Sequence, residues 1–151
     1  MRAHYQDLAQ SIAALTDGED DQIALMATVA GALHHSDDRF DWTGFYRVVA
    51  PKLLKIGPYQ GGHGCLVIPF SRGVCGAAAR TQKVQLVADV NAFEGHIACA
   101  SSTQSEIVLP VWDAAGALIA VLDIDSDQRG AFDKSDAVAL ARILAATFAR
   151  G

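Results

Sequence analysis

Three cysteines are the side chains of this chain best suited to redox or metal chemistry. Cys65, Cys75 and Cys99 all lie between Gly57 and Glu106, in a stretch rich in glycine and polar residues. A cysteine can be a small buried hydrophobe, a metal ligand or a redox-active nucleophile. Structural zinc sites prefer closely spaced cysteine pairs, and this chain contains none. We therefore expect no metal site, and burial and redox activity remain as the two interpretations of these thiols.

A redox role requires a nucleophilic thiolate and a second thiol that can reach it. A thiol near His96, or one in the first turn of a helix as we expect for Cys75, can have its pKa lowered. The residues alone therefore favour Cys75 as the nucleophile. They do not say which two cysteines come within the distance of a disulfide bond.

A group of acidic and aromatic residues is the second candidate for chemistry. Asp123 and Asp125 lie two apart on a predicted strand, so both point to the same face, and we expect Glu106 to converge on them. Either the strand simply emerges into solvent there, or the carboxylates bind an ammonium group and supply an acid. Trp42 and Tyr46 share a face of another predicted strand, either as core residues or as an apolar wall for a small ligand.

The elements that position these residues follow from the spacing of apolar side chains. That spacing predicts helices at residues 3–17, across the apolar stripe 23–33, at 73–80 and from Asp133 to the C-terminal end. Runs of aromatic and β-branched residues predict strands at 42–49, 53–59, 66–68, 84–87, 107–112 and 117–125. We therefore predict an α+β fold with a central antiparallel β-sheet of about six strands. The N- and C-terminal helices cover one face and a loop-rich insert covers the other, with a ligand pocket beneath the insert.

Length and charge exclude several classes of function. The 151 residues suit one domain with its own core. A net charge of −5 without a cluster of basic residues argues against binding nucleic acid. No apolar run reaches the ~18 residues of a membrane span, and the N-terminus lacks the apolar segment of a signal peptide. We therefore expect a cytoplasmic protein that contacts neither membrane nor nucleic acid.

Several segments of the chain form a set that is similar to the motifs of a known family. They are Trp42-x-Gly44-Phe45-Tyr46, Gly57-Pro58-Tyr59-Gln60-Gly61, Ile68-Pro69-Phe70, Gly73-Val74-Cys75-Gly76, Gly95-His96-Ile97-Ala98-Cys99, Ser105-Glu106-Ile107-Val108 and Val121-Leu122-Asp123-Ile124-Asp125-Ser126. These segments resemble the free methionine-(R)-sulfoxide reductases, which are single-domain enzymes of the GAF fold. The resemblance covers the chain from about Trp42 to Phe132. It implies one GAF domain over residues 1–151.

The resemblance also implies a reaction. It implies the reduction of free L-methionine (R)-sulfoxide to methionine, without a cofactor. By analogy, Cys99 is the nucleophile and becomes a sulfenic acid, Cys65 resolves it as a disulfide, and thioredoxin reduces that disulfide. Cys75 matches the third cysteine of the family, either as an alternative resolving thiol or as part of the pocket lining. The resemblance thus assigns the nucleophile to Cys99, where the residues alone favour Cys75.

The remaining expectations complete this interpretation. Glu106 and Asp125 are the expected proton donors to the sulfoxide oxygen, and Asp123 helps them to hold the substrate ammonium. Trp42 and Tyr46 are expected to enclose the S-methyl group. Related folds often pair through their terminal helices, so we expect a homodimer. The alternative function is that of a non-catalytic GAF module that binds and senses a small ligand.

Overall fold

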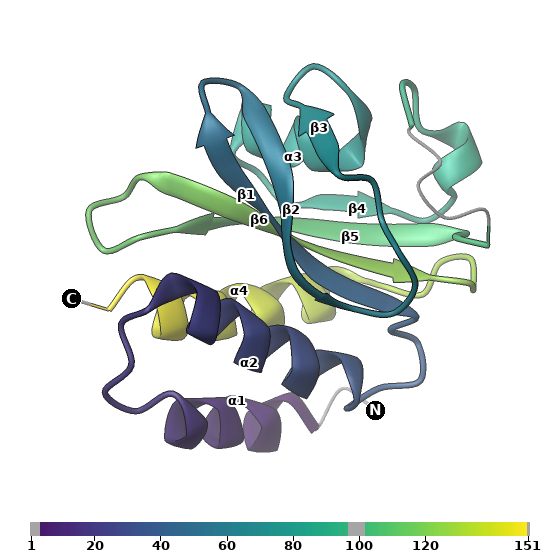
Figure 1. Ribbon diagram of the computed structural model, residues 1–151. Coiled ribbons are helices and arrows are strands. Elements are labelled where there is room, and N and C mark those ends of the chain that lie inside the picture. The colour runs from purple at the N-terminus through teal and green to yellow at the C-terminus, as the bar shows by residue number, and fades with distance from the viewer. Residues whose placement is uncertain (1–3, 97–101, 151) are drawn as a thin grey trace.

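A six-stranded antiparallel sheet forms the centre of the computed structural model, which describes residues 4–96 and 102–150 (Figure 1). The strand order across the sheet is β3-β2-β1-β6-β5-β4. The strands are β1 (Trp42–Ala50), β2 (Leu53–Gln60), β3 (Val67–Pro69), β4 (Gln85–Val87), β5 (Ser105–Trp112) and β6 (Leu118–Ser126). Consecutive strands are joined by short turns at β1–β2 and β5–β6, which makes these pairs antiparallel.

Three helices form two layers on one face of this sheet. Helix α2 (Gln22–His34) packs on β1 and β2, and α4 (Lys134–Phe148) packs on β5. Helix α1 (His4–Leu15) contacts α2 and α4 and forms the outer layer (Figure 1). The short helix α3 (Gly73–Thr81) lies on the opposite face, where it contacts β5 and β6. The expected α+β arrangement, with the insert opposite the terminal helices, is therefore confirmed.

Acidic caps fix where two of these helices begin. The side chain of Asp21 accepts hydrogen bonds from the backbone N–H groups of Ile23 (2.9 Å) and Ala24 (3.1 Å) at the start of α2. Asp133 and Asp136 form a reciprocal capping box at the start of α4, as the sequence predicts. These carboxylates satisfy N–H groups that have no partner within the helix.

The alternation of side chains along β6 divides the interior into two clusters. Leu122 and Ile124 point toward the helical layers and belong to the larger apolar core. Asp123 and Asp125 point to the other face, toward α3. There a smaller cluster forms from residues of α3 and of the strands β1, β2, β3, β5 and β6, namely Trp42, Tyr46, Leu54, Ile68, Val74, Cys75, Ala78, Ala79, Val108 and Val121. The candidate site lies in this smaller cluster.

A buried polar network ties α1 and α4 to the segment that precedes β1. The Arg39 guanidinium donates to Asp37 at 2.8 Å and to Asp136 at 3.0 Å. The Tyr5 hydroxyl donates to Asp136 at 2.8 Å. This network therefore links the outer helix to the rest of the fold.

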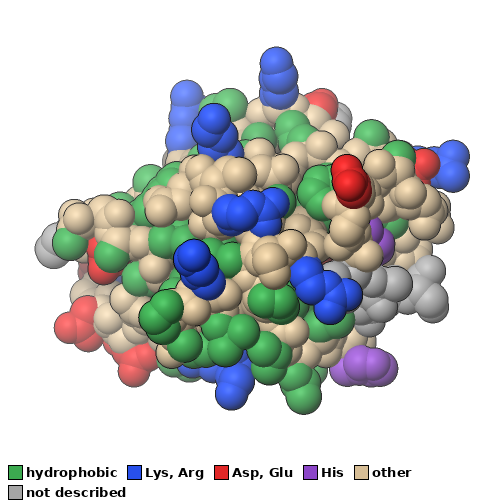
Figure 2. All heavy atoms as spheres, turned by 90° about the horizontal axis from the view of Figure 1, so that it is seen from above, with side chains coloured by type: hydrophobic (Ala, Val, Ile, Leu, Met, Phe, Trp, Pro, Cys, Tyr) green, Lys and Arg blue, Asp and Glu red, His purple; other side chains and the backbone are tan. Residues whose placement is uncertain are grey.

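Helix length and the distribution of charged side chains are the features of the surface that bear on membrane and nucleic-acid binding. None of the helices within 4–96 and 102–150 is long and apolar enough to span a bilayer. Figure 2 shows one face, on which Lys and Arg side chains are spread among apolar and uncharged groups.

Candidate functional site

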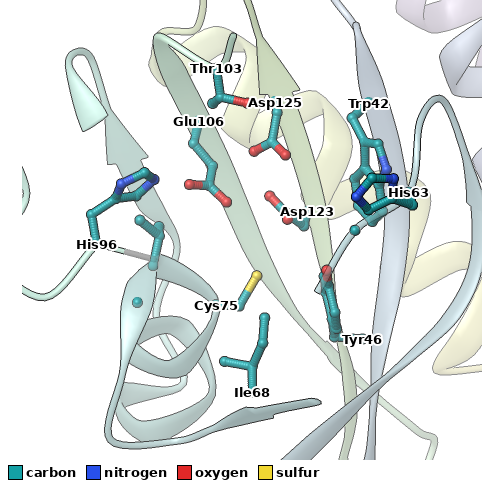
Figure 3. Close-up of a pocket in the computed structure, with 13 residues that line it drawn as sticks. Trp42, Tyr46, His63, Ile68, Cys75, His96, Thr103, Glu106, Asp123 and Asp125 are labelled. Atoms are coloured by element: carbon teal, nitrogen blue, oxygen red, sulfur yellow. The ribbon is translucent and has the colours of Figure 1, made fainter. Parts of the chain in front are cut away.

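Strand register brings the three predicted carboxyl groups together. Glu106 on β5 is paired directly with Asp125 on β6, and Val108 is paired with Asp123. The three carboxyl side chains point toward one another on the face covered by α3 (Figure 3). Glu106 is only 6% exposed and Asp123 only 5%. The strand therefore does not emerge into solvent here, and the expected convergence of Glu106 on the two aspartates is confirmed.

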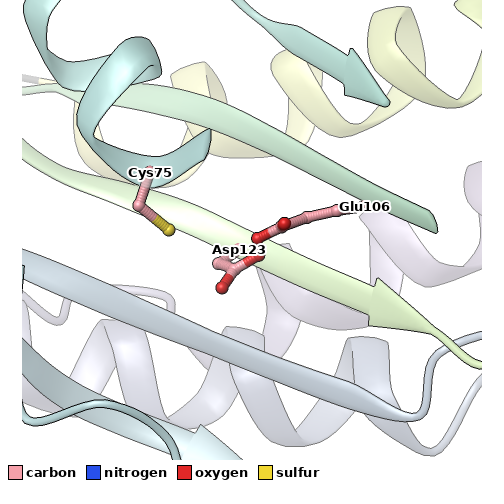
Figure 4. A group of neighbouring side chains, drawn as sticks. All are labelled: Cys75, Glu106 and Asp123. Carbon is pink, nitrogen blue, oxygen red and sulfur yellow. The ribbon is translucent and has the colours of Figure 1, made fainter. Parts of the chain in front are cut away.

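Helix α3 places Cys75 against this cluster of three carboxyl side chains. The thiol points toward Asp123 and Glu106, and one ligand atom from each of these three residues lies within 4.8 Å of the others (Figure 4). The helix can approach the sheet closely because Gly76 has no side chain: a Cβ there would lie 2.8 Å from the backbone oxygens of Pro69 and Phe70. Cys75 is thereby buried at the base of the pocket.

Burial and mutual repulsion control the charge of the carboxyl cluster. Burial raises the pKa of Glu106, Asp123 and Asp125 well above the usual range, and their neighbouring carboxylates raise it further. One oxygen of Asp123 and one of Asp125 are buried without a hydrogen-bond partner among the described residues. The described lining residues include no Lys or Arg. The cluster therefore holds protons more tightly than isolated carboxyl groups do, and two of its buried oxygens remain able to accept a hydrogen bond from a bound cation.

The expected lowering of the Cys75 pKa by its position at a helix start is wrong. Burial raises the pKa of this thiol well above the ordinary value, and the charges of Asp123, Glu106 and Asp125 raise it further. A helix N-terminus stabilises a thiolate only modestly and over a short range. Here desolvation and three acidic neighbours outweigh it, so the Cys75 thiol is protonated at neutral pH.

An aromatic wall closes the pocket on the side of β1 and β2. The rings of Trp42 and Tyr46 stack with centroids 5.9 Å apart, and Tyr59 stacks on Trp42 at 5.3 Å. The Trp42 indole N–H donates to the backbone oxygen of Gly62 at 2.7 Å. This hydrogen bond ties the wall to the loop that carries Cys65, which is half-buried and packs against the same cluster.

Cys99 lies outside the described residues, so its position relative to the carboxyl groups is untested. His96 borders the pocket, and burial lowers its pKa (Figure 3). Its imidazole is therefore neutral at pH 7 and provides no positive charge there. The expected lowering of the pKa of a thiol near His96 would therefore not come from a positive charge on this imidazole.

Several lining residues were not predicted as site residues. The inner volume of the pocket is about 30 Å³, and the additional lining residues are His63, Gly64, Ile68, Gly73, Val74, His96 and Thr103. A Cβ on Gly64 would lie 2.9 Å from the Tyr46 hydroxyl oxygen, so glycine keeps this side of the pocket open. The glycine-rich sequence before Cys65 was a signal for such a close approach. Thr103 has no comparable signal in the sequence.

Fold and site together define a small-molecule pocket between a curled sheet and a covering insert, and a family model for the GAF domain matches residues 15–151. The chain belongs to the GAF domain family. Protein YtsP from Bacillus subtilis is 47% identical over 133 residues, which cover 87% of this chain and 81% of YtsP. The free methionine-R-sulfoxide reductase of Escherichia coli is 40% identical over 141 residues, which cover 93% of this chain and 84% of that protein.

A solved structure extends this similarity to three dimensions. The X-ray structure of free methionine-R-sulfoxide reductase from Neisseria meningitidis, in complex with its substrate, matches with a TM-score of 0.91 and 37% identity. The match covers 97% of this chain and 87% of the Neisseria chain. The resemblance found in the sequence motifs and the GAF fold that it implied are both confirmed.

Proposed function

We propose that this chain reduces free L-methionine (R)-sulfoxide to L-methionine. The observation that carries the proposal is the buried group of Glu106, Asp123 and Asp125, two of whose oxygens remain able to accept a hydrogen bond from a bound cation. The ammonium of a free amino acid is such a cation. Trp42 and Tyr46 offer an apolar wall to the S-methyl group. The names of the Escherichia coli and Neisseria relatives support the same substrate.

The carboxyl cluster accounts for selectivity toward the free amino acid. A methionine sulfoxide within a polypeptide has an amide in place of the ammonium and would leave the buried carboxylates without a cation. Sites with buried polar groups strongly reject ligands that leave those groups unpaired. We assign the main contact with the substrate ammonium to the Asp123 carboxylate. Glu106 and Asp125 lie next to Asp123 and help to bind the ammonium.

The proposed reaction begins at Cys99. Its thiolate attacks the sulfoxide sulfur, the S–O bond of the substrate breaks, and the oxygen is retained on Cys99 as a sulfenic acid. Methionine leaves, so the sulfoxide is reduced by two electrons and the thiol is oxidised by two. Cys65 then attacks the Cys99 sulfur, which forms a disulfide and releases water. The protonated state of Cys75 supports this choice of nucleophile, because only a thiolate attacks efficiently.

A protonated carboxyl group assists this reaction. The sulfoxide oxygen gains basicity as the S–O bond breaks, and an acid held next to it stabilises that change. Three carboxyl groups in such close contact do not all ionise together, so the cluster holds a proton at neutral pH. Glu106 and Asp125 are the proposed donors, and the raised pKa of each supports that role.

The catalytic cycle is completed by an external dithiol. We assign this role to thioredoxin, which reduces the disulfide and restores both thiols. A reducing cytoplasm is the compartment in which such a cycle operates. The proposal includes a homodimer, with each chain carrying its own complete carboxyl cluster.

The test is a coupled assay with thioredoxin, thioredoxin reductase and NADPH. The substrates are the two resolved sulfur diastereomers of free L-methionine sulfoxide and the N-acetylated form of the (R) diastereomer. We expect NADPH consumption with the free (R) diastereomer alone. The N-acetylated control isolates the ammonium, since it keeps the sulfoxide and the side chain unchanged.

Two results would contradict the proposal. Equal turnover of free and N-acetylated substrate would show that the carboxyl cluster does not select the ammonium. No turnover of either diastereomer by a folded protein with all three thiols reduced would instead favour a GAF module that binds a small ligand without catalysis.

A further inference from the structure

The base of the pocket combines the donor types that bind a thiophilic divalent cation. Cys75 contributes a sulfur atom, and Glu106 and Asp123 each contribute a carboxylate oxygen. All three residues are buried, and the three donor atoms lie within 4.8 Å of one another (Figure 4). They come from α3, β5 and β6, so the rule that structural zinc ligands are closely spaced in sequence does not describe them.

This donor set matches zinc better than magnesium or calcium. Zinc accepts thiolate and carboxylate ligands in tetrahedral geometry, at roughly 2.3 Å for sulfur and about 2.0–2.2 Å for oxygen. Magnesium and calcium prefer all-oxygen coordination. Three ligands close enough to share one zinc ion, after small side-chain adjustments, leave a fourth position that faces the pocket. That arrangement is typical of open zinc sites.

An independent observation is that the cluster contains buried carboxyl oxygens without a hydrogen-bond partner among the described residues. Asp123 is 5% exposed, points into the pocket, and has a buried Oδ1 without a hydrogen-bond partner among the described residues. Asp125 also has such an oxygen, and the described lining contains no Lys or Arg. The inner volume of about 30 Å³ is sufficient for one ion with a bound water.

We propose that Zn²⁺ binds to Cys75, Glu106 and Asp123 and inhibits the enzyme by taking the place of the substrate ammonium. Binding replaces the thiol proton of Cys75 with a sulfur–zinc bond and releases that proton to solvent. The bound ion then coordinates Asp123, which we assign to the substrate ammonium, and Glu106, which we assign as a proton donor. The inhibitory part of the inference rests on the proposed function, whereas metal binding itself does not.

The binding test uses Co²⁺ as a spectroscopic substitute for zinc. The full chain is reduced, freed of reductant and titrated with Co²⁺ under anaerobic conditions. We expect one ion per chain, a thiolate-to-cobalt charge-transfer band in the near ultraviolet, and loss of both on addition of Zn²⁺. A titration without a charge-transfer band would overturn the proposal.

Matched variants assign the thiol ligand. We expect the charge-transfer band to disappear in Cys75→Ser and to persist in Cys65→Ser, which also removes one thiol. The reverse pattern would overturn the assignment. Asp123→Asn should weaken cobalt binding by at least about tenfold, while Glu94→Gln, which changes an exposed acid, should leave it unchanged. Unchanged binding in Asp123→Asn would also count against the site.

Activity measurements separate this inference from the proposed function. Zn²⁺ should raise the KM for the free (R)-sulfoxide without lowering kcat, and a chelator should restore the original KM. A Cys75-dependent cobalt band in a protein that reduces neither diastereomer would overturn the function and leave the metal site standing. Turnover of the (R) diastereomer that is insensitive to Zn²⁺, with no cobalt band, would overturn the metal site alone.

Discussion

At the scale of single residues, the environment of a side chain decides its chemistry more than its place in an element. Cys75 lies in the first turn of α3, where a lowered pKa is a reasonable expectation from sequence. The structure surrounds the thiol with Asp123, Glu106 and Asp125, and burial with these charges raises its pKa instead. Those acids lie far from Cys75 along the chain, so no local sequence rule could reveal the reversal.

The roles of the cysteines lead to the first prediction. We expect Cys99→Ser to abolish methionine formation, because the proposed nucleophile is lost. Cys75→Ser should keep most of the turnover, since its thiol is protonated and lines the pocket. Rates of both variants are measured in the thioredoxin-coupled assay. Loss of activity in Cys75→Ser, with activity retained in Cys99→Ser, would reverse the assignment.

Glu106 provides the second prediction. Glu106→Gln keeps the size of the side chain but removes its acidic proton, so kcat should fall by roughly a hundredfold or more. Glu94→Gln serves as the control, because Glu94 is exposed and lies outside the pocket. Steady-state kcat and KM are compared at neutral pH. A kcat equal to that of the unmodified chain would exclude Glu106 as the acid.

At the scale of elements, local patterns predicted nearly all helices and strands, and strand pairing was the missing information. The apolar strands at 107–112 and 117–125 were predicted from their composition, and their antiparallel pairing as β5 and β6 brings Glu106 together with Asp125. The pairing of β1 with β6 is a long-range contact with no local signal. That pairing sets Trp42 opposite Asp125 and so places the aromatic wall beside the carboxyl groups. The sequence alone therefore identified the aromatic residues and the carboxyl residues as candidates, but it could not show that they lie next to each other in one pocket.

The aromatic wall depends on a glycine, which gives the third prediction. A Cβ on Gly44 would lie 2.4 Å from the Tyr59 Cβ and 2.6 Å from the Trp42 ring. Gly44→Ala should therefore lower the free energy of unfolding by about 1–3 kcal/mol, because both aromatic residues must shift.

The matched control is Gly62→Ala, where a Cβ would meet nothing within 4 Å. It should change the free energy of unfolding by less than about 0.5 kcal/mol. Urea denaturation measures both variants. Equal stability of the two would mean that the aromatic stack tolerates displacement.

At the scale of the whole molecule, the helical layers and the pocket lie on opposite faces of one sheet. The network of Arg39, Asp37, Asp136 and Tyr5 holds α1 and α4 on the far face and shares no residue with the described lining of the pocket. We therefore expect substitutions in this network to change the stability of the fold without changing the chemistry of the pocket. Burying three carboxyl groups around the pocket destabilises the folded state. The larger apolar core, between the sheet and the helical layers, offsets that destabilisation.

Arg39 gives the fourth prediction, which concerns stability and its pH dependence. Arg39→Met leaves Asp37 and Asp136 buried without their cation and should cost about 3–5 kcal/mol at pH 7. Burial opposes ionisation of Asp37, but hydrogen bonds from Arg39 outweigh it and lower the pKa of Asp37 below its ordinary value. A lowered pKa stabilises the fold above the unfolded-state value, and this contribution is lost as pH falls through the folded-state value.

The stability difference between the unmodified chain and Arg39→Met should therefore shrink below about pH 4. Denaturation curves at pH 7 and pH 3 test this expectation. A difference that stays constant, or grows as pH falls, would show that the ion pair is not its source. The affinity for substrate should be unaffected at pH 7 in any Arg39→Met protein that remains folded.

The most direct test of the proposed chemistry is a single-turnover measurement without any external reductant. The fully reduced chain is freed of reductant, mixed with excess free methionine sulfoxide of one sulfur configuration, and the methionine formed is quantified. We expect methionine in proportion to the enzyme from the (R) diastereomer and none from the (S) diastereomer, with a matching loss of free thiols. Absence of methionine from the (R) diastereomer, with all thiols still reduced, would contradict the assignment of this pocket as a reductase site.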